Sequence, residues 1–202
     1  MVINLKELVK KYIEKNKSNL LLLLTIYVVG IIVGLLLFII IQSESKSEII
    51  SSIQNTVNLA TDGSFSGINI LKNGLQTNSI FLILLIFSSF TIIAFPVIAF
   101  IIFLKGISLS MYICILFKIF GIWKGLLAMF GIAIIPSIIV TIAYIFLGNE
   151  CYHSNLKLLI RINNKSIIKN IFSNVTKALA IIPFIILSIY IEQIFFKIVI
   201  GI

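Results

Sequence analysis

Charge is scarce in this chain, and histidine is scarcer still. The 202 residues include 16 Lys and Arg, 7 Asp and Glu and one histidine, so only 11% of the chain is charged. Apolar residues make up 60%, and the mean hydropathy is +1.19. A water-soluble domain this apolar could not cover its surface with polar groups. The composition therefore indicates a protein that is embedded in a membrane.

Catalytic and metal-binding motifs are missing as well. The chain has no P-loop, GxGxxG, GxSxG or HExxH pattern. Cys151 and His153 lie two positions apart, but there is no second Cys/His pair to complete a four-ligand zinc site. Cys114 lies within an apolar run, so we expect no disulfide between it and Cys151. We therefore expect a protein that is not an enzyme and that holds no metal or cofactor.

What the chain does have is a series of long apolar runs. A helix that crosses about 30 Å of hydrocarbon needs roughly 20 residues. The runs predict an all-α, polytopic helical bundle that forms a single membrane domain over residues 1–202. Its five transmembrane helices are expected at about 20–41, 80–104, 106–122, 126–147 and 178–197.

The third and fourth runs form the centre of the expected fold. Residues 126–147 carry no charge and span unaided. Residues 106–122 span only if Lys118 carries its ammonium to the headgroups on its flexible stem. The short basic connection Gly121–Gly125 joins the two runs. We therefore expect a tight transmembrane hairpin here.

The basic residues decide the orientation. With five spans and the N-terminus in the cytoplasm, eleven Lys and Arg lie inside, Lys105 among them, and five lie outside. If residues 107–124 only dip into the membrane, the counts become nine inside and seven outside. The positive-inside rule favours the first arrangement, with the C-terminus outside, the polar loop 42–79 outside and the polar loop 149–177 inside. Because the net charge of +9 flanks apolar runs, we expect contact with anionic lipids and not with nucleic acid.

Two basic segments also have apolar faces. Residues 1–18 contain five lysines and apolar residues at helical spacing. This tail either lies on the membrane as an amphipathic helix or is a solvated lead-in, and both interpretations stay open. Residues 166–177 predict an interfacial helix that leads into the last span. Glu192 is expected near the outer end of that span, within reach of solvent.

Glycine and proline occur inside the apolar runs. Gly30 and Gly34 form a GxxxG spacing, which lets another helix approach closely. Pro96, Pro136 and Pro183 lie inside expected spans, where each removes a helical hydrogen bond and predicts a kink. Kinked helices either surround a cavity or simply pack with one another, and the sequence leaves both interpretations open.

The loop 42–79 is the longest hydrophilic segment of the chain. Its centre, residues 62–67, has the composition of a turn. Before that turn, Ile49, Ile53 and Val57 predict one apolar face of a short helix. Because loops outside the lipid are the usual place for partners to bind, we expect this face to be a docking surface.

Residues 73–138 contain an ordered series of short motifs. Asn73 precedes the second apolar run, and the fourth run contains Ile135-Pro136-Ser137-Ile138. Between them lie two turn-like groups, formed by Phe103, Leu104, Lys105 and Gly106 and by Lys124, Gly125, Leu126 and Leu127. This order resembles the stage II sporulation protein M family of small polytopic membrane proteins. That family commonly has a Leu-Pro-Gln-Asn-like group in the fourth span, where this chain has a single serine.

The resemblance implies a non-enzymatic scaffold of the engulfment machinery in a spore-forming bacterium. Such a scaffold recruits the peptidoglycan-remodelling stage II sporulation proteins D and P. It would lie in the bacterial cytoplasmic membrane, at the septal and engulfing membranes. The bilayer and a second copy of the chain are further expected contacts. The alternative, from another functional class, is a small transporter or the membrane subunit of a transport complex.

Overall fold

The fold is built from long helices whose middle parts carry almost no charge. The computed structural model describes residues 5–41, 47, 48, 50, 51, 54, 67–89, 94–160 and 164–200. All regular secondary structure in these ranges is helical. The elements are α1 (Leu5–Ile40), α3 (Gly67–Ser88), α4 (Ala94–Ala128), the π-helical turn η1 (Met129–Ile134), α5 (Ile135–Ile160) and α6 (Asn164–Ile200).

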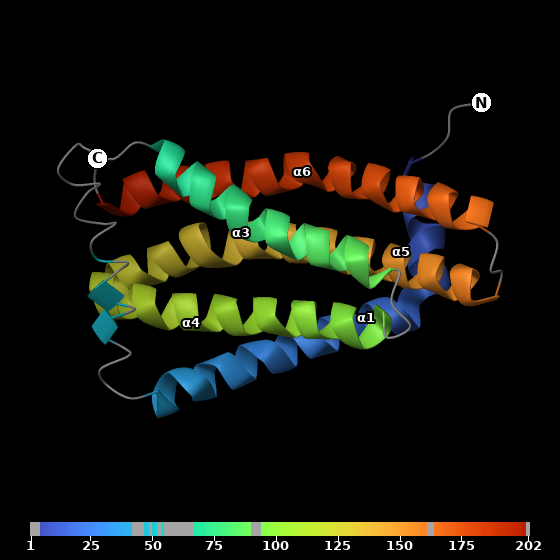
Figure 1. Cartoon of the computed structure of the whole chain (residues 1–202). Coiled ribbons are helices and arrows are strands. Elements are labelled where there is room, and N and C mark those ends of the chain that lie inside the picture. Colours follow the sequence, from blue (N-terminus) through green and yellow to red (C-terminus); the bar gives the residue numbers. More distant parts are fainter. Residues whose placement is uncertain are drawn as a thin grey trace.

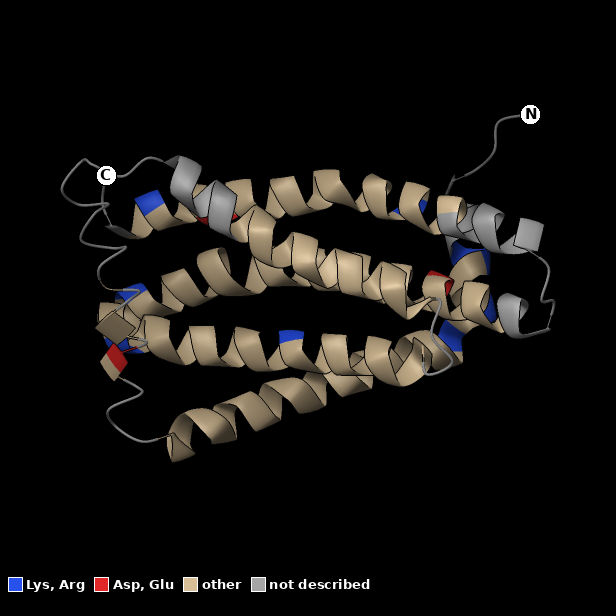
Figure 2. Ribbon diagram, in the orientation of Figure 1, with Lys and Arg blue, Asp and Glu red and all other residues tan. Residues whose placement is uncertain are grey.

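Three helical stretches are long and apolar enough to cross a bilayer. They are Lys10–Ile40, Ala94–Leu156 and Phe172–Val199. Large apolar side chains are also exposed on the outside of the bundle, which is typical of helices that face lipid. Figure 2 shows most of the charged residues near the two ends of the bundle. The expected all-α membrane bundle is thus confirmed at the level of fold class.

The helices lie side by side and alternate in direction (Figure 1). The first helix, α1, begins at the end of the bundle where α5 ends and α6 begins, and it then runs along α4. The helix α3 contacts α4, α5 and α6. The last helix, α6, ends at the opposite end of the bundle from the start of α1.

The core lies between α3, α4, α5 and α6. Its most completely buried apolar side chains are Leu85, Ile98, Ile102, Leu116, Ile132, Tyr144, Leu147, Ile185 and Ile189. Because lipid is as apolar as these side chains, close packing rather than exclusion of water holds such a core together.

The chain reverses direction at Gly121. This residue has φ 71° and ψ −172°, a backbone conformation that L side chains rarely adopt and that glycine adopts freely. The helical stretch Ala94–Leu156 therefore folds into a hairpin, and α4 and α5 lie beside each other in opposite directions (Figure 1). The reversal lies at the first residue of the connection Gly121–Gly125 that the sequence indicated.

The expected span 80–104 is wrong, because the chain leaves the helix in the middle of it. The helix α3 ends at Ser88, and α4 begins only at Ala94. The Ser88 hydroxyl donates to the Leu85 carbonyl at 2.7 Å, and the Ser89 amide donates to the Ile86 carbonyl at 3.1 Å. These short-range bonds end the helix, since serine side chains compete for backbone carbonyls.

Both expected polar loops are shorter than predicted. The last third of loop 42–79 belongs to α3, which starts at Gly67. Most of loop 149–177 is also helical, because α5 continues to Ile160 and α6 already starts at Asn164. Packing between the two helix ends overrides their polar composition, as tertiary contacts often do.

The N-terminal tail is likewise part of a spanning helix. From Leu5 to Ile40, α1 runs without interruption. Its first turns contact α5, so they are neither a solvated lead-in nor a separate helix on the membrane surface. The residues Ile49, Ile53 and Val57, predicted to bind a partner, lie outside the described residues.

The three prolines have three different surroundings. Pro96 lies in the first turn of α4, where a missing amide leaves no helical bond unmade, so the predicted interior kink is wrong there. Pro136 is the second residue after η1, and the amide of Ile135, which caps η1, bonds to the Phe130 carbonyl five residues earlier. This wider turn is the local distortion next to Pro136. Pro183 lies within α6.

The closest helix contact joins α1 to α4 through three glycines. A Cβ on Gly106 would lie 2.9 Å from the Ile31 amide nitrogen, and one on Gly34 would lie 2.8 Å from Ile107 Cα. A Cβ on Gly30 would lie 3.3 Å from Gly106 Cα. The two backbones are therefore too close for any side chain, which is the packing that a GxxxG spacing permits. Gly106 is thus a packing residue rather than part of a turn.

Alanine at Gly30 and Gly34 together should loosen α1 from α4. Each added methyl would approach the α4 backbone more closely than van der Waals contact allows, so the helices must separate. We expect a loss of about 1–3 kcal/mol of stability, as for other overpacked sites. The measurement is the midpoint of thermal unfolding in detergent.

The matched control for this variant is Gly74→Ala in α3. The nearest atoms to a methyl there all belong to the side chain of Ile189, with Cδ1 at 3.0 Å and Cγ1 at 3.1 Å, rather than to the backbone of another helix. It should leave the unfolding midpoint nearly unchanged. An equal loss of stability in the control and in the double variant would contradict the close α1–α4 contact.

Candidate functional site

A cavity with both apolar and polar lining residues lies in the bundle between α3, α4, α5 and α6. Its volume is about 480 Å³, in the range of small-molecule sites. The residue Ile132 of η1 also lines it. The polar lining residues are Thr77, Asn78, Lys105, Ser108, Tyr112, Ser137, Thr141, Ser188 and Glu192.

The cation in the cavity wall is Lys105. Its ammonium donates a hydrogen bond to Asn78 Oδ1 at 2.8 Å and lies 4.4 Å from the centre of the Phe81 ring. It also lies 5.3 Å from the ring centre of Tyr144, whose hydroxyl donates to the Asn78 carbonyl at 2.9 Å. A hydrogen bond and two aromatic faces thus replace part of the water that a buried lysine loses.

The anion in the cavity wall is Glu192. The hydroxyl of Tyr112 donates to its Oε1 at 3.1 Å. Lys105 and Glu192 form no direct ion pair. The ion pairs in the described part of the chain are Lys10–Glu14 and Lys177–Glu150. Both charges instead face the same cavity.

The depth of Lys105 corrects its predicted position. At 1.5 Å per residue, it lies about 16 Å from the start of α4 and about 24 Å from Gly121. It is therefore inside the bundle and not at a loop on the inner side. Glu192 likewise lines the interior cavity. The prediction that it lies near the outer end of the last span, within reach of solvent, is therefore wrong.

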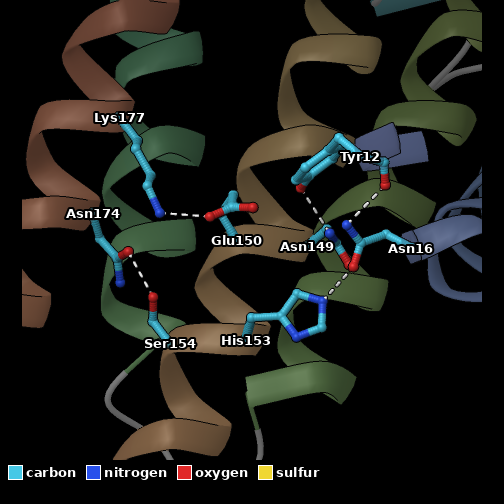
Figure 3. Close-up of polar contacts among 8 residues, drawn as sticks. All are labelled: Tyr12, Asn16, Asn149, Glu150, His153, Ser154, Asn174 and Lys177. Atoms are coloured by element: carbon cyan, nitrogen blue, oxygen red, sulfur yellow. Dashed lines mark hydrogen bonds and ion pairs between the residues drawn. The ribbon is translucent and has the colours of Figure 1, made fainter. Parts of the chain in front are cut away.

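A second polar cluster joins the end of α5 to the starts of α1 and α6. We call it the helix-end network; it consists of Tyr12, Asn16, Asn149, Glu150, His153, Ser154, Asn174 and Lys177 (Figure 3). In Figure 3 these side chains point toward one another from three helices. The network therefore ties the tail of the chain to the helix ends.

On the α1 side, the network is made of amides, a phenol and the imidazole. Asn149 Nδ2 donates to the Tyr12 hydroxyl at 2.8 Å. Asn16 Nδ2 donates to the Tyr12 carbonyl at 3.0 Å, and Asn16 Oδ1 lies 2.8 Å from His153 Nε2. Because the amide oxygen can only accept, Nε2 of His153 carries the proton of this bond.

On the α6 side, the network contains an ion pair. The Lys177 ammonium lies 2.5 Å from Glu150 Oε2, and the Ser154 hydroxyl donates to Asn174 Oδ1 at 2.9 Å. The buried atoms Asn149 Oδ1 and Asn174 Nδ2 have no hydrogen-bond partner within the described residues. Unpaired buried amide atoms are costly, so the remaining bonds of these two residues matter for stability.

The pair Cys151 and His153 does not act together in this network. Cys151 is fully buried, whereas His153 bonds to Asn16 on α1. Among the described residues, no group of three His, Cys, Asp or Glu side chains is placed to hold a metal ion.

The residues that carry the family resemblance lie at two places. Phe103 and Gly106 face α1 while Lys105 lines the cavity. Residues 124–127 follow the reversal at Gly121, and the neighbouring Trp123 is 88% exposed. Sequence reasoning missed the cavity residues Asn78 and Tyr112, and it also missed Tyr144, whose hydroxyl bonds to Asn78. The signal was present, since these are polar residues within apolar helical runs.

Comparisons with protein-family models, with curated proteins and with solved structures found no match for this chain.

Removing the hydroxyl of Tyr12 should destabilise the helix-end network. In Tyr12→Phe, the buried amide of Asn149 loses the partner that its Nδ2 has in the network, after which neither of its polar atoms has a partner among the described residues. We expect about 1–3 kcal/mol less stability, seen as a lower thermal midpoint in detergent. The control Tyr190→Phe removes an exposed hydroxyl on α6 and should have no effect. A Tyr12→Phe protein as stable as wild type would contradict the network.

Proposed function

We propose that this chain is a non-enzymatic membrane scaffold of the sporulation engulfment machinery. It recruits the peptidoglycan-remodelling stage II sporulation proteins D and P to the septal and engulfing membranes. One observation carries the proposal: the motifs that resemble the family occupy positions that organise the bundle. Phe103–Gly106 contacts α1, and Lys124–Leu127 follows the hairpin reversal.

We further propose that the chain crosses the membrane five times, with its N-terminus in the cytoplasm and its C-terminus outside. The alternating course of the helices supports this topology. So does the charge distribution once Lys105 is placed inside the bundle. Ten Lys and Arg then flank the end with the N-terminus and the α5–α6 connection, against five toward the other end.

Reporter fusions test this topology. A reporter that is active only in the cytoplasm should be active when fused after Lys177, because α6 has not yet crossed the membrane. It should be inactive when fused after Ile202, beyond the last crossing. Activity at both positions would rule out the five-span arrangement.

The docking surface of the scaffold lies in the segment that connects α1 to α3, on the outer side in this topology. The proposed partners work on that side of the membrane. Ile49, Ile53 and Val57 provide the apolar residues that usually anchor a protein interface. The long hydrophilic connection gives a partner access away from the lipid.

Charged residues on this apolar face should abolish partner recovery. In Ile49→Asp with Ile53→Asp, the carboxylates cannot enter an apolar interface without losing their hydration. We expect proteins D and P to be lost from a mild-detergent pull-down, analysed by mass spectrometry. The matched control, Ser51→Asp with Gln54→Asp, adds the same charge at exposed positions and should retain the partners. Recovery that is equal in the two variants would overturn this docking surface.

A second candidate function is transport, because the bundle encloses Lys105 and Glu192 in one cavity. Ionisable groups at such depth often mark a pathway for an ion or substrate. The two functions differ in what Glu192→Gln does. If the protein is a scaffold, Glu192→Gln keeps partner recovery and engulfment. If it is a transporter, Glu192→Gln loses function, whereas Ile49→Asp with Ile53→Asp stays active.

A further inference from the structure

The interior cavity has an unusual balance of charge. Among the described residues that line it, Lys105 is the one cation and Glu192 the one anion, and these do not pair with each other directly. Buried charges are normally paired, because losing hydration is costly. Two opposite charges that are held apart in one cavity leave room for a partner between them.

Each charged group also has bonding capacity left. The ammonium of Lys105 has three N–H donors, and its side-chain hydrogen bond to Asn78 uses one of them. Glu192 receives the Tyr112 hydroxyl on Oε1, and Oε2 has no hydrogen-bond partner among the described residues. A ligand that enters the cavity can therefore accept from the lysine and donate to the glutamate.

The net charge of the site selects the kind of ligand. A simple anion would be attracted by Lys105 but repelled by Glu192. A simple cation would be attracted by Glu192 but repelled by Lys105. A molecule with both an anionic and a cationic group satisfies both side chains. We propose that the cavity binds a phosphodiester–ammonium zwitterion of the phosphoethanolamine type, as a lipid headgroup or as its soluble counterpart.

The walls and the opening of the cavity fit such a ligand. The volume of about 480 Å³ exceeds what a single ion needs. Thr77 of α3 and Ser108 of α4 line the cavity and are exposed, so it opens between these two helices. On another wall lie Ile132 of η1 and Pro136, and π-helical turns are frequent at functional sites.

The test uses the purified full-length protein and matched probes. The soluble pair is glycerophosphoethanolamine, which is zwitterionic, and glycerophosphoglycerol, which carries one net negative charge. The lipid pair is phosphatidylethanolamine and phosphatidylglycerol, added to protein in detergent. Binding is measured by native mass spectrometry and by the shift of the thermal midpoint. Binding within the soluble pair identifies a solute as the ligand, and binding within the lipid pair identifies a lipid headgroup.

We expect the zwitterion of at least one pair to bind about tenfold more tightly than its anionic counterpart. Lys105→Met and Glu192→Gln should each weaken that binding by about tenfold or more. The controls Lys118→Met and Glu14→Gln remove exposed charges outside the cavity and should change nothing. Ser137→Leu fills the cavity without touching either charge and should block binding.

Two results would overturn the proposal. One is wild-type protein that binds neither zwitterion, or binds it no better than the matched anion. The other is zwitterion binding that survives in folded Lys105→Met and Ser137→Leu proteins, since the ligand would then lie elsewhere. The Ser137→Leu variant keeps the test valid if a charge variant fails to fold. Partner recovery is not a readout here, so this outcome is independent of the scaffold function.

Discussion

The position of Lys105 inside the bundle is the constraint on which the rest of the structure depends. A lysine at this depth requires polar and aromatic partners, which Asn78, Phe81 and Tyr144 provide from α3 and α5. On the next residue, Gly106 brings the backbone of α1 against α4. One turn of α4 therefore fixes the interior cavity on one side and the closest helix contact on the other.

The two polar regions suit different tasks. The helix-end network joins three helices through buried amides and the Lys177–Glu150 ion pair, so it holds the ends of the bundle together. The cavity is instead only partly satisfied by its own residues, because Lys105 and Glu192 face it without pairing. A rigid connection between helix ends suits a scaffold, and a ligand site explains why Lys105 and Glu192 face the cavity without pairing.

The sequence predicts the class of this fold well, but it predicts poorly where the individual helices begin and end. Apolar composition and run length were enough for an all-α membrane bundle, and the hairpin reversal at Gly121 lies where the basic, glycine-containing connection was recognised. The α3–α4 break at Ser88 was missed, because an apolar run continues across it and Pro96 was interpreted as an interior kink. The same error in the helix boundaries placed Lys105 in a predicted loop, whereas it lies in the interior of the bundle. Partners such as Asn78 and Tyr144 are distant in sequence, so single-chain periodicity cannot bring them together.

The most direct measurement is a cysteine-pair experiment on Asn78 and Lys105, in a chain whose Cys114 and Cys151 are replaced by serine. If Lys105 lies in the bundle against α3, a short bifunctional thiol reagent should cross-link Asn78→Cys to Lys105→Cys, because the contact between the two native residues is made by the tip of the long lysine side chain. In inside-out vesicles, the single Lys105→Cys variant should resist a bulky maleimide that readily labels Lys10→Cys, which is exposed near the start of α1. Rapid labelling of Lys105→Cys, together with no cross-link to position 78, would place this residue in a cytoplasmic loop and contradict the account.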